Sequence, residues 1–313
     1  MSKFGFVFPG QGSQKTGMLR ALARRYPEIE STFAEASEVV SLDLWTIASS
    51  DSDGLLDQTH ITQPVLLTAS VAIWRLWLSQ GRKLPDLLAG HSLGEYSALV
   101  CADVLDLDDA VKAVHDRGKY MQQAVPAGTG AMAAIIGLDD DKIIELCRDV
   151  AHGEVVAAVN FNSTGQTVIA GHKAAVERAM AACKDAGAKR ALALNVSVPS
   201  HCSLMLPAAE KLAQDLRHLH FRSPTIPIVQ NVNGRVAKTP EDIRENLIKQ
   251  LYMPVQWVES ITYMWDLGLG KIVECGPGKI LCSLIKRIEG EIECYSTEDP
   301  EDFEQTKAAL VIG

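Results

Sequence analysis

The stretch Gly90-His91-Ser92-Leu93-Gly94 separates a short apolar run from a helical pattern. The apolar run over residues 84–89 predicts a buried strand, and residues 95–100 predict the start of a helix. A serine flanked by glycines between a strand and a helix is typical of a nucleophile elbow. Its hydroxyl would lie above a helix N-terminus, whose free N–H groups and dipole favour a developing oxyanion. The pattern predicts acyl transfer through Ser92, with an ordinary glycine-rich turn as the alternative.

The composition limits the classes of protein. The 313 residues are 47% hydrophobic and 22% charged, which suits one large globular domain or two linked units. A net charge of −9 argues against general nucleic-acid binding. The seven cysteines form no C-x-x-C pair, so we expect no disulfide framework and a reducing cytoplasm. The eight histidines form no metal-ligand pattern, so we also expect no metal.

No segment predicts a signal peptide or a membrane span. The apolar run within residues 1–8 is too short for a signal peptide. The uncharged stretch over residues 61–74 contains Pro64 and several polar residues, which disfavour a span. We therefore expect a cytoplasmic protein that does not contact a membrane, and we expect a monomer.

The pattern of predicted elements changes near residues 126–130, where small residues form a linker. From 131 to 196 the order is strand, helix, strand, strand, helix, strand, which predicts a ferredoxin-like unit. We expect residues 127–198 to form this inserted domain, and residues 1–126 and 199–313 to form the larger, discontinuous domain. The expected strands cover residues 4–8, 84–89, 131–136, 155–160, 166–170, 191–196, 226–229 and 271–274.

The expected helices follow the apolar periodicity. They cover residues 18–26, 29–40, 107–123, 139–150, 173–186, 207–219, 240–251, 257–265 and 279–287, with a long helix following Thr62-Gln63-Pro64. Acidic residues between Glu298 and Glu304 predict a solvated loop in the tail.

A serine nucleophile needs a base within hydrogen-bond reach. His201 follows the inserted unit, at the seam between the two expected domains, where a cleft is typical. A helix-start cap is the alternative role for His201. His91 adjoins Ser92 in sequence and would point away from it, so we expect a structural histidine there.

Gln11 and Arg117 are candidates for binding roles. Gln11 lies in a Gly-Gln-Gly turn that matches neither a phosphate loop nor a dinucleotide fingerprint, which leaves an oxyanion-hole role or a simple turn. Arg117 lies on an amphipathic helix with no carboxylate three or four residues away. Its guanidinium could bind a carboxylate through two parallel hydrogen bonds, and a solvated surface arginine is the alternative.

Six short motifs together resemble the malonyl-CoA:acyl carrier protein transacylase family of bacterial fatty acid synthesis. The likeness runs from about residue 3 to about residue 287. In chain order, the motifs are Phe8-Pro9-Gly10-Gln11-Gly12-Ser13-Gln14, Gly90-His91-Ser92-Leu93-Gly94-Glu95-Tyr96, Arg117-Gly118, Asn160-Phe161-Asn162-Ser163, Val198-Pro199-Ser200-His201 and Glu274-Cys275-Gly276-Pro277-Gly278.

The resemblance implies an α/β fold, in which an α/β-hydrolase-like large domain with a parallel sheet core carries an inserted ferredoxin-like small domain. It also implies that Ser92 is the acylated nucleophile and that His201 is its base. The side chain of Gln11 and the N–H of Leu93 would form the oxyanion hole, and Arg117 would bind the free carboxylate of malonate.

In this family a neutral group orients the histidine in place of an aspartate, and Gln250 looks like the matching position. The implied reaction moves the malonyl group from malonyl-CoA, as substrate, to the phosphopantetheine thiol of acyl carrier protein, with no bound cofactor. The carrier is acidic, as the resemblance implies, so a local positive surface would dock it. Four basic residues are candidates, with scattered solvated charge as the alternative: Lys189, Arg190, Lys286 and Arg287.

Three other functions remain open. An acyltransferase that serves a polyketide synthase would use the same chemistry with another carrier. A carboxylesterase or thioesterase would use the same elbow, although an acidic triad member is not evident in the sequence. A non-catalytic scaffold that binds the carrier is disfavoured by the presence of both Ser92 and His201.

Overall fold

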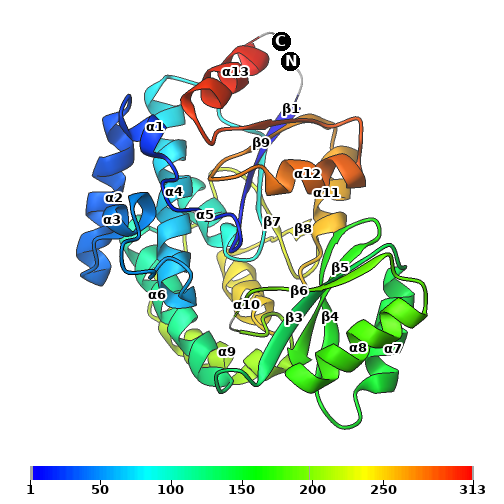
Figure 1. Cartoon of the computed structure of the whole chain (residues 1–313). Coiled ribbons are helices and arrows are strands. Elements are labelled where there is room, and N and C mark those ends of the chain that lie inside the picture. The colour runs from blue at the N-terminus through cyan, green and yellow to red at the C-terminus, as the bar shows by residue number, and fades with distance from the viewer. Residues whose placement is uncertain (1–2, 197, 312–313) are drawn as a thin grey trace.

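The computed structural model describes residues 3–196 and 198–311 and contains two β-sheets (Figure 1). Residues 1–2, 197 and 312–313, which fall within the expected domains, lie outside the described residues. Both ends of the described chain, at β1 and α13, lie at the same end of the molecule.

The larger sheet has six strands in the order β10-β9-β1-β2-β7-β8. All neighbouring pairs are parallel except β7 and β8, which are antiparallel. The strands are β1 (Lys3–Phe8), β2 (Leu87–Gly90), β7 (Ile228–Gln230), β8 (Arg235–Val236), β9 (Leu269–Glu274) and β10 (Glu293–Ser296). The chain is therefore a mixed α/β protein with a largely parallel sheet, as expected.

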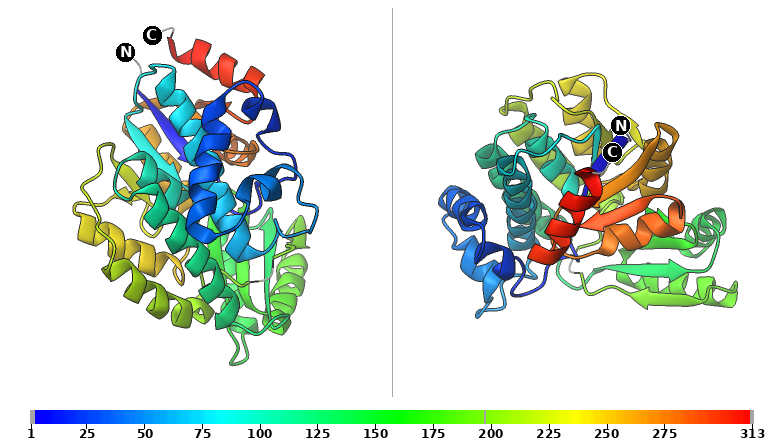
Figure 2. Two further views of the ribbon diagram at one scale, coloured as in Figure 1. Left: turned by 90° about the vertical axis from the view of Figure 1, so that its left-hand side faces the viewer. Right: turned by 90° about the horizontal axis from the view of Figure 1, so that it is seen from above.

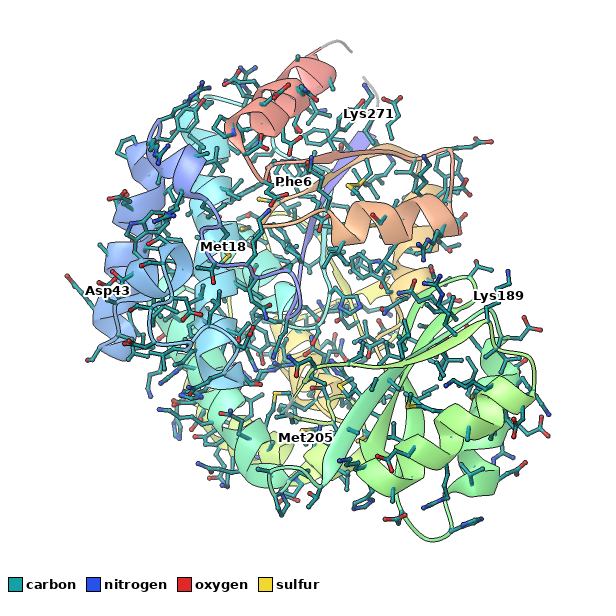
Figure 3. All side chains as sticks on the ribbon, viewed as in Figure 1. Phe6, Met18, Asp43, Lys189, Met205 and Lys271 are labelled. Carbon is teal, nitrogen blue, oxygen red and sulfur yellow. A yellow bond between two sulfur atoms is a disulfide. The ribbon has the colours of Figure 1, made fainter. Side chains whose placement is uncertain are left out.

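Alternating side chains of β1 supply both faces of this sheet. Phe6 packs against Trp74 and Trp77 of α4 (Thr59–Ser79), with ring centroids 5.6 and 5.2 Å apart. Val7 points to the opposite face, where it joins the core formed with α11 (Trp257–Asp266) and α12 (Ile280–Ile288). Helices thus cover both faces, as Figures 1 and 2 show, with Phe6 inside (Figure 3).

The remaining helices of this part lie around the sheet. They are α1 (Arg20–Ala23), α2 (Pro27–Val40), α3 (Leu44–Ser49), α5 (Gly94–Cys101), α6 (Leu107–Ala124), α9 (Leu206–Arg217), α10 (Pro240–Gln250) and α13 (Pro300–Val311), with a 3-10 turn at Ser203–Met205.

The smaller sheet is antiparallel and has the order β4-β5-β3-β6. Its elements are β3 (Gly130–Ile136), α7 (Asp140–Val150), β4 (Val156–Ser163), β5 (Gln166–His172), α8 (Lys173–Asp185) and β6 (Arg190–Ala193). Helices α7 and α8 cover one face of this smaller sheet. On the other face, Met132 and Val168 pack in one cluster with Cys202, which lies outside the smaller sheet. The predicted order of these elements is confirmed, although β6 ends three residues before the expected position.

Helix α4 differs from its prediction because it begins at Thr59 and contains Pro64. A proline inside a helix leaves the carbonyl four residues earlier without its usual N–H donor. Here the His60 carbonyl oxygen lies 2.6 Å from Nδ1 of His115, which supplies a replacement donor. The helix is long and apolar enough to cross a membrane, but 89% of its most apolar window is buried, which is typical of a core helix.

The tail also differs from its prediction. The segment interpreted as an acidic loop, Glu298 to Glu304, contains the start of α13, and Asp299 accepts N–H bonds from its first turn. Phe303 anchors this helix, because its buried ring packs against Trp77 at 6.2 Å between centroids. A single apolar position in an acidic segment was too weak a signal to predict the helix.

Cys282 of α12 and Cys294 of β10 form a disulfide, with their Cα atoms 5.4 Å apart. We expected no disulfide framework from the cysteine pattern, and this one disulfide is a correction to that expectation. The pairing depends on α12 packing beside the edge strand, which cysteine spacing alone does not reveal. The other five cysteines are free and buried.

A substitution at Gly94 tests how closely the turn that carries Ser92 packs against the end of β1. A Cβ atom there would overlap the carbonyl oxygen of Phe8. We expect Gly94→Ala to lower the free energy of unfolding by about 3 kcal/mol or more, because the atoms that the new Cβ would overlap belong to the backbone of Phe8 and Pro9, which cannot move aside as a flexible side chain could. Chemical denaturation measures this change. Gly270→Ala is the matched control, since a Cβ there meets nothing within 4 Å. Equal stability of the two variants would contradict the close approach.

Candidate active site

The serine lies on a sharp turn between β2 and α5. Ser92 has φ of 52°, in the left-handed region that non-glycine residues rarely adopt. Asn231, one residue beyond β7, holds this turn from below: its Oδ1 accepts the Ser92 N–H at 2.7 Å, and its Nδ2 donates to the Gly90 carbonyl at 2.5 Å. A strained residue held by buried hydrogen bonds is the geometry expected of a nucleophile elbow.

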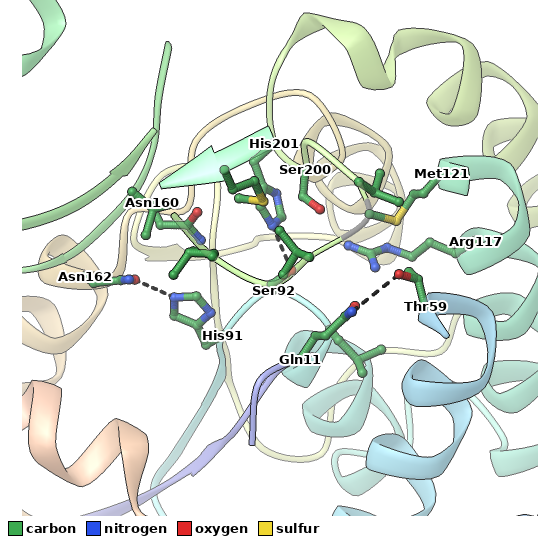
Figure 4. A pocket seen from close by; sticks show the side chains of 16 residues that line it. Gln11, Thr59, His91, Ser92, Arg117, Met121, Asn160, Asn162, Ser200 and His201 are labelled. Atoms are coloured by element: carbon green, nitrogen blue, oxygen red, sulfur yellow. Dashed lines mark hydrogen bonds between the residues drawn. The ribbon is translucent and has the colours of Figure 1, made fainter. Parts of the chain in front are cut away.

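His201 lies directly opposite the serine (Figure 4). Its Nε2 is 2.8 Å from the Ser92 hydroxyl oxygen, and its Nδ1 is 2.6 Å from the backbone carbonyl oxygen of Gln250. A carbonyl oxygen can only accept, so Nδ1 carries the proton and Nε2 offers a lone pair to the hydroxyl. This is the arrangement that a general base for Ser92 requires.

The imidazole of His201 is strongly biased toward its neutral form. Its side chain is buried, and burial together with the Arg117 charge lowers the pKa of His201 to about 3. The hydrogen bond to Gln250 opposes this shift without cancelling it. At neutral pH the ring is therefore free to accept a proton.

Arg117 reaches the same site from α6 and is 1% exposed. Its two terminal nitrogens donate to Oε1 of Gln63 at 2.7 Å and to Oε1 of Gln250 at 3.0 Å. Neither partner is charged, and burial lowers the pKa of Arg117. The solvated-surface alternative is therefore wrong. A buried guanidinium held by neutral amides is suited to receive an anionic group.

Gln11 lines the same cavity as Ser92, and Leu93 follows the serine in the chain. The side chain of Gln11 lines the cavity and donates to Thr59 Oγ1 at 3.4 Å (Figure 4). Among the described residues, no backbone carbonyl accepts the N–H of Leu93. Gly10 brings the two segments together, because a Cβ there would lie 2.5 Å from the His91 carbonyl oxygen. The geometry leaves one backbone donor and one amide available beside Ser92.

One cavity of about 160 Å³ joins these groups. A cavity of ~150 Å³ holds a benzene molecule, so a three-carbon acyl group fits. Five of the six predicted site residues line it, namely Gln11, Ser92, Leu93, Arg117 and His201. Both parts of the chain contribute, since Met132, Asn160, Asn162 and Val168 come from the smaller sheet.

Gln250, the sixth predicted residue, lies beneath the cavity. The resemblance implied that it orients the histidine, and the contact with His201 comes from its backbone carbonyl. Its side chain instead connects three groups: Nε2 donates to the Ser92 carbonyl at 2.9 Å and to Glu95 Oε2 at 2.8 Å, while Oε1 accepts from Arg117.

His91 also lines the cavity but turns away from Ser92. Its Nε2 is 2.7 Å from Oδ1 of Asn162, and its ring packs against Trp257 at 5.3 Å between centroids. These contacts agree with the predicted structural role, and they tie the elbow to β4 of the smaller sheet.

Sequence reasoning missed Gln63, Glu95 and Asn231, which position the predicted groups. Gln63 and Glu95 are each 1% exposed, and each lies in a helix whose residues are mostly buried. Glu95 is the one charged residue of α5, and this was an available signal because a buried charge needs a partner. Gln63 is one of several buried polar residues of α4 and gave no such signal. Asn231 had no comparable signal in its turn.

The His201 pKa can be measured by NMR titration of its imidazole. We expect the ring to stay neutral from pH 8 down to pH 5, because its pKa lies near 3. An unperturbed histidine titrates near ~6.5 over the same range. Ser92→Ala is a useful second sample, since burial and Arg117 cause the shift and the serine does not. A midpoint near the unperturbed value in either sample would contradict the buried, neutral base.

Comparison with known proteins agrees with this geometry. The family model described as "Acyl transferase domain" matches residues 5–289. The malonyl CoA-acyl carrier protein transacylase of Escherichia coli K12 is 57% identical over 300 residues, covering 96% of this chain and 97% of that protein. A crystal structure of an acyl carrier protein S-malonyltransferase from Vibrio cholerae is 55% identical, with a TM-score of 0.95, covering 97% of this chain and all of that chain.

A second solved structure is a malonyl-transacylase in complex with a type II polyketide synthase acyl-carrier protein. It is 52% identical, with a TM-score of 0.97, and the match covers 98% of this chain and all of that chain. The family match and the identity and coverage of these relatives together show the family to which the chain belongs. The chain belongs to the malonyl CoA-acyl carrier protein transacylase family of acyltransferases.

Proposed function

We propose that this chain transfers the malonyl group of malonyl-CoA to the phosphopantetheine thiol of acyl carrier protein through a malonyl-serine intermediate. The observation that carries the proposal is one cavity that contains the Ser92–His201 pair and the buried Arg117. The malonyl transferases among the relatives named above support the same substrate and carrier.

In the first half-reaction, His201 Nε2 takes the hydroxyl proton of Ser92 while Oγ bonds to the thioester carbonyl carbon. The carbonyl oxygen becomes an oxyanion, which the Leu93 N–H and the Gln11 amide stabilise. Collapse of this intermediate breaks the carbon–sulfur bond, and His201 returns the proton to the coenzyme A thiolate. The product is a malonyl ester on Ser92.

The second half-reaction reverses these steps with a new thiol. The phosphopantetheine thiol gives its proton to His201 and its sulfur attacks the ester carbonyl carbon. The carbon–oxygen bond then breaks and Ser92 recovers the proton. A neutral carbonyl partner for His201 suffices here, because a thioester is more reactive than an amide and demands less of the base.

Arg117 supplies the selectivity in this proposal. Its guanidinium is desolvated and, among the described residues, donates hydrogen bonds to amide oxygens, so a free acyl carboxylate would provide an opposite charge in direct contact. An acetyl group would leave the guanidinium without a directly bonded anion, which makes acetyl-CoA a poor substrate.

We infer a two-domain organisation for this function. Residues 1–126 and 199–313 would form an α/β-hydrolase-like domain, and residues 127–198 an inserted ferredoxin-like domain. The parallel strands around the serine turn support the first assignment. The strand order β4-β5-β3-β6, joined through α7 and α8, supports the second.

We also propose where the enzyme acts, its oligomeric state and how it binds the carrier. We propose a cytoplasmic monomer without a cofactor, and a docking surface for the acidic carrier that includes basic residues of both domains. All four candidates are exposed, namely Lys189, Arg190, Lys286 and Arg287 (Lys189 is labelled in Figure 3). Arg287 also donates to Gln166 Oε1 at 2.6 Å, so it connects α12 with β5.

A second candidate function is malonyl transfer to a polyketide synthase carrier. The similarity to a malonyl-transacylase bound to such a carrier favours it. Parallel transfer assays with the two kinds of carrier protein distinguish the pathways. A hydrolase function is less well supported, because His201 contacts a carbonyl where a hydrolase triad uses a carboxylate.

The direct test is mass spectrometry of the protein after incubation with malonyl-CoA. We expect one malonyl adduct, mapped to Ser92, that disappears when a carrier with its phosphopantetheine thiol is added. Ser92→Ala should form no adduct, and His201→Ala should form it far more slowly. An adduct on another residue, or release of free malonate without transfer to the carrier, would overturn the proposal.

Arg117→Ala tests the origin of selectivity. We expect malonyl transfer to fall roughly 100-fold, as loss of a buried charge partner does elsewhere, while acetyl transfer is kept or gained. Arg117→Lys is the control, since it retains the charge and loses the planar fork. Steady-state kinetics with both donors give the ratio. An unchanged ratio in Arg117→Ala would show that the carboxylate binds elsewhere.

A further inference from the structure

Glu95 is a buried carboxylate that the proposed reaction does not use. It lies three residues after the serine, in the first turn of α5, and is 1% exposed. Its Oε2 accepts hydrogen bonds from Gln250 Nε2 at 2.8 Å and from the Asn231 N–H at 3.1 Å. Its Oε1 has no hydrogen-bond partner among the described residues. A buried carboxylate with an unpartnered oxygen lowers the stability of the fold, which suggests that Glu95 has a role in the site beside the nucleophile.

The Gln250 side chain connects Glu95 to Arg117. An ionised carboxylate only accepts hydrogen bonds and a guanidinium only donates them. The amide between them therefore has one possible orientation, with Nε2 toward Glu95 and Oε1 toward Arg117. Glu95 and the Ser92 carbonyl, which both accept from Nε2, thus orient the amide so that Arg117 meets an acceptor, although no hydrogen bond joins Glu95 directly to Arg117 in the described residues.

Glu95 is the carboxylate whose charge favours the ionised form of Arg117. Its hydrogen-bond partners, Gln63 and Gln250, are both neutral, and its Nε is unpartnered among the described residues. Tyr96 packs its ring 5.7 Å from the guanidinium carbon, and burial raises the pKa of Tyr96 to about 12, so this phenol is neutral at pH 7. Glu95 is the negative group that balances Arg117 within this cluster.

We propose that Glu95 is the counter-charge of Arg117 in the empty site, and that the acyl carboxylate replaces it in this role when the substrate binds. Glu95 is then a positioning and specificity-determining residue that acts through Gln250. The inference rests on the proposed function, because it assumes that Arg117 receives the acyl carboxylate.

The protonation of Glu95 supports this exchange of roles. Burial raises the pKa of Glu95 to about 7, while its bonds to Gln250 and Asn231 and the Arg117 charge lower it. A second negative charge at Arg117 weakens the last of these effects and raises the pKa further. Glu95 should then take up a proton near pH 7, and its unpartnered Oε1 can carry it.

The other titratable groups around Glu95 do not change charge near pH 7. The pKa of His201 lies near 3, and burial also lowers the pKa of His91. Tyr96 stays neutral and Arg117 stays charged. Asn231 and Gln250, which donate hydrogen bonds to Glu95, do not titrate.

Glu95→Gln is the first test, because it removes the charge and retains an oxygen acceptor of the same shape. Without its counter-charge, Arg117 should bind an acyl carboxylate more tightly. We expect the KM for malonyl-CoA to fall roughly tenfold with little change in kcat, and the kinetics with acetyl-CoA to stay within about twofold. A merely structural role would lower kcat for both donors alike, and that result would overturn the inference.

Glu274→Gln is the matched control. Glu274 is also fully buried, and it accepts N–H bonds from Leu281 and Cys282 at the start of α12, outside the cavity. This variant should lose stability without changing the ratio of malonyl to acetyl kinetics. An equal change in that ratio for both variants would contradict a specific role for Glu95.

The second test leaves Glu95 intact and so does not depend on the folding of its variants. Calorimetric titration of Ser92→Ala, in two buffers of different ionisation enthalpy, counts the protons taken up on binding. We expect uptake of part of a proton at pH 7 with malonyl-CoA and none with acetyl-CoA. The two donors share the nucleotide and the pantetheine, so the difference reports the acyl carboxylate. Equal uptake with both donors would overturn the inference.

Arg117→Ala separates this inference from the proposed function. If that variant keeps the preference for malonyl-CoA, the acyl carboxylate binds elsewhere, and the selectivity role of Arg117 and this inference both fail while malonyl transfer through Ser92 stands. If the preference is lost in Arg117→Ala while Glu95→Gln is unchanged, the proposed function stands and only the role of Glu95 is rejected.

Discussion

The hydrogen bond between Ser92 Oγ and His201 Nε2 depends on two residues held in left-handed backbone conformations. Ser92 has φ of 52° and His201 has φ of 65°. Each such conformation costs on the order of 1 kcal/mol or more, so the surroundings must compensate for it. Asn231 braces the serine turn, and the carbonyls of Gln250 and Leu251 hold the ring and the N–H of His201. The reactive pair is thus positioned by backbone and amide groups.

Burial sets the electrostatics of the same site. His201, Arg117 and Glu95 are each at most 3% exposed, and desolvation is the largest influence on the pKa of all three. The base is neutral, the guanidinium has no direct carboxylate partner among the described residues, and burial raises the pKa of Glu95 to about 7. The neutral amide of Gln250 separates Glu95 from Arg117, so Arg117 can still bind a negatively charged group of the substrate.

Much of this site could be predicted from the sequence. The glycines that flank Ser92 predict the sharp turn, and the six ordered motifs carry the resemblance from which the roles of the other site residues were predicted. The pairing of Ser92 with His201 and the burial of Arg117 agree with the contacts in the structure. The contact of His201 with a backbone carbonyl could not be predicted, since any residue at position 250 supplies one. The start of α4 was also wrong, because a histidine on another helix replaces the hydrogen-bond donor that Pro64 removes.

A crystal structure of the protein after brief exposure to malonyl-CoA tests the central claim most directly. The account predicts a malonyl ester on Ser92 Oγ, with the ester carbonyl oxygen at the Leu93 N–H and the free carboxylate on the Arg117 guanidinium. An acyl group on another residue would contradict it. So would a carboxylate that faces solvent while Arg117 keeps only its bonds to Gln63 and Gln250.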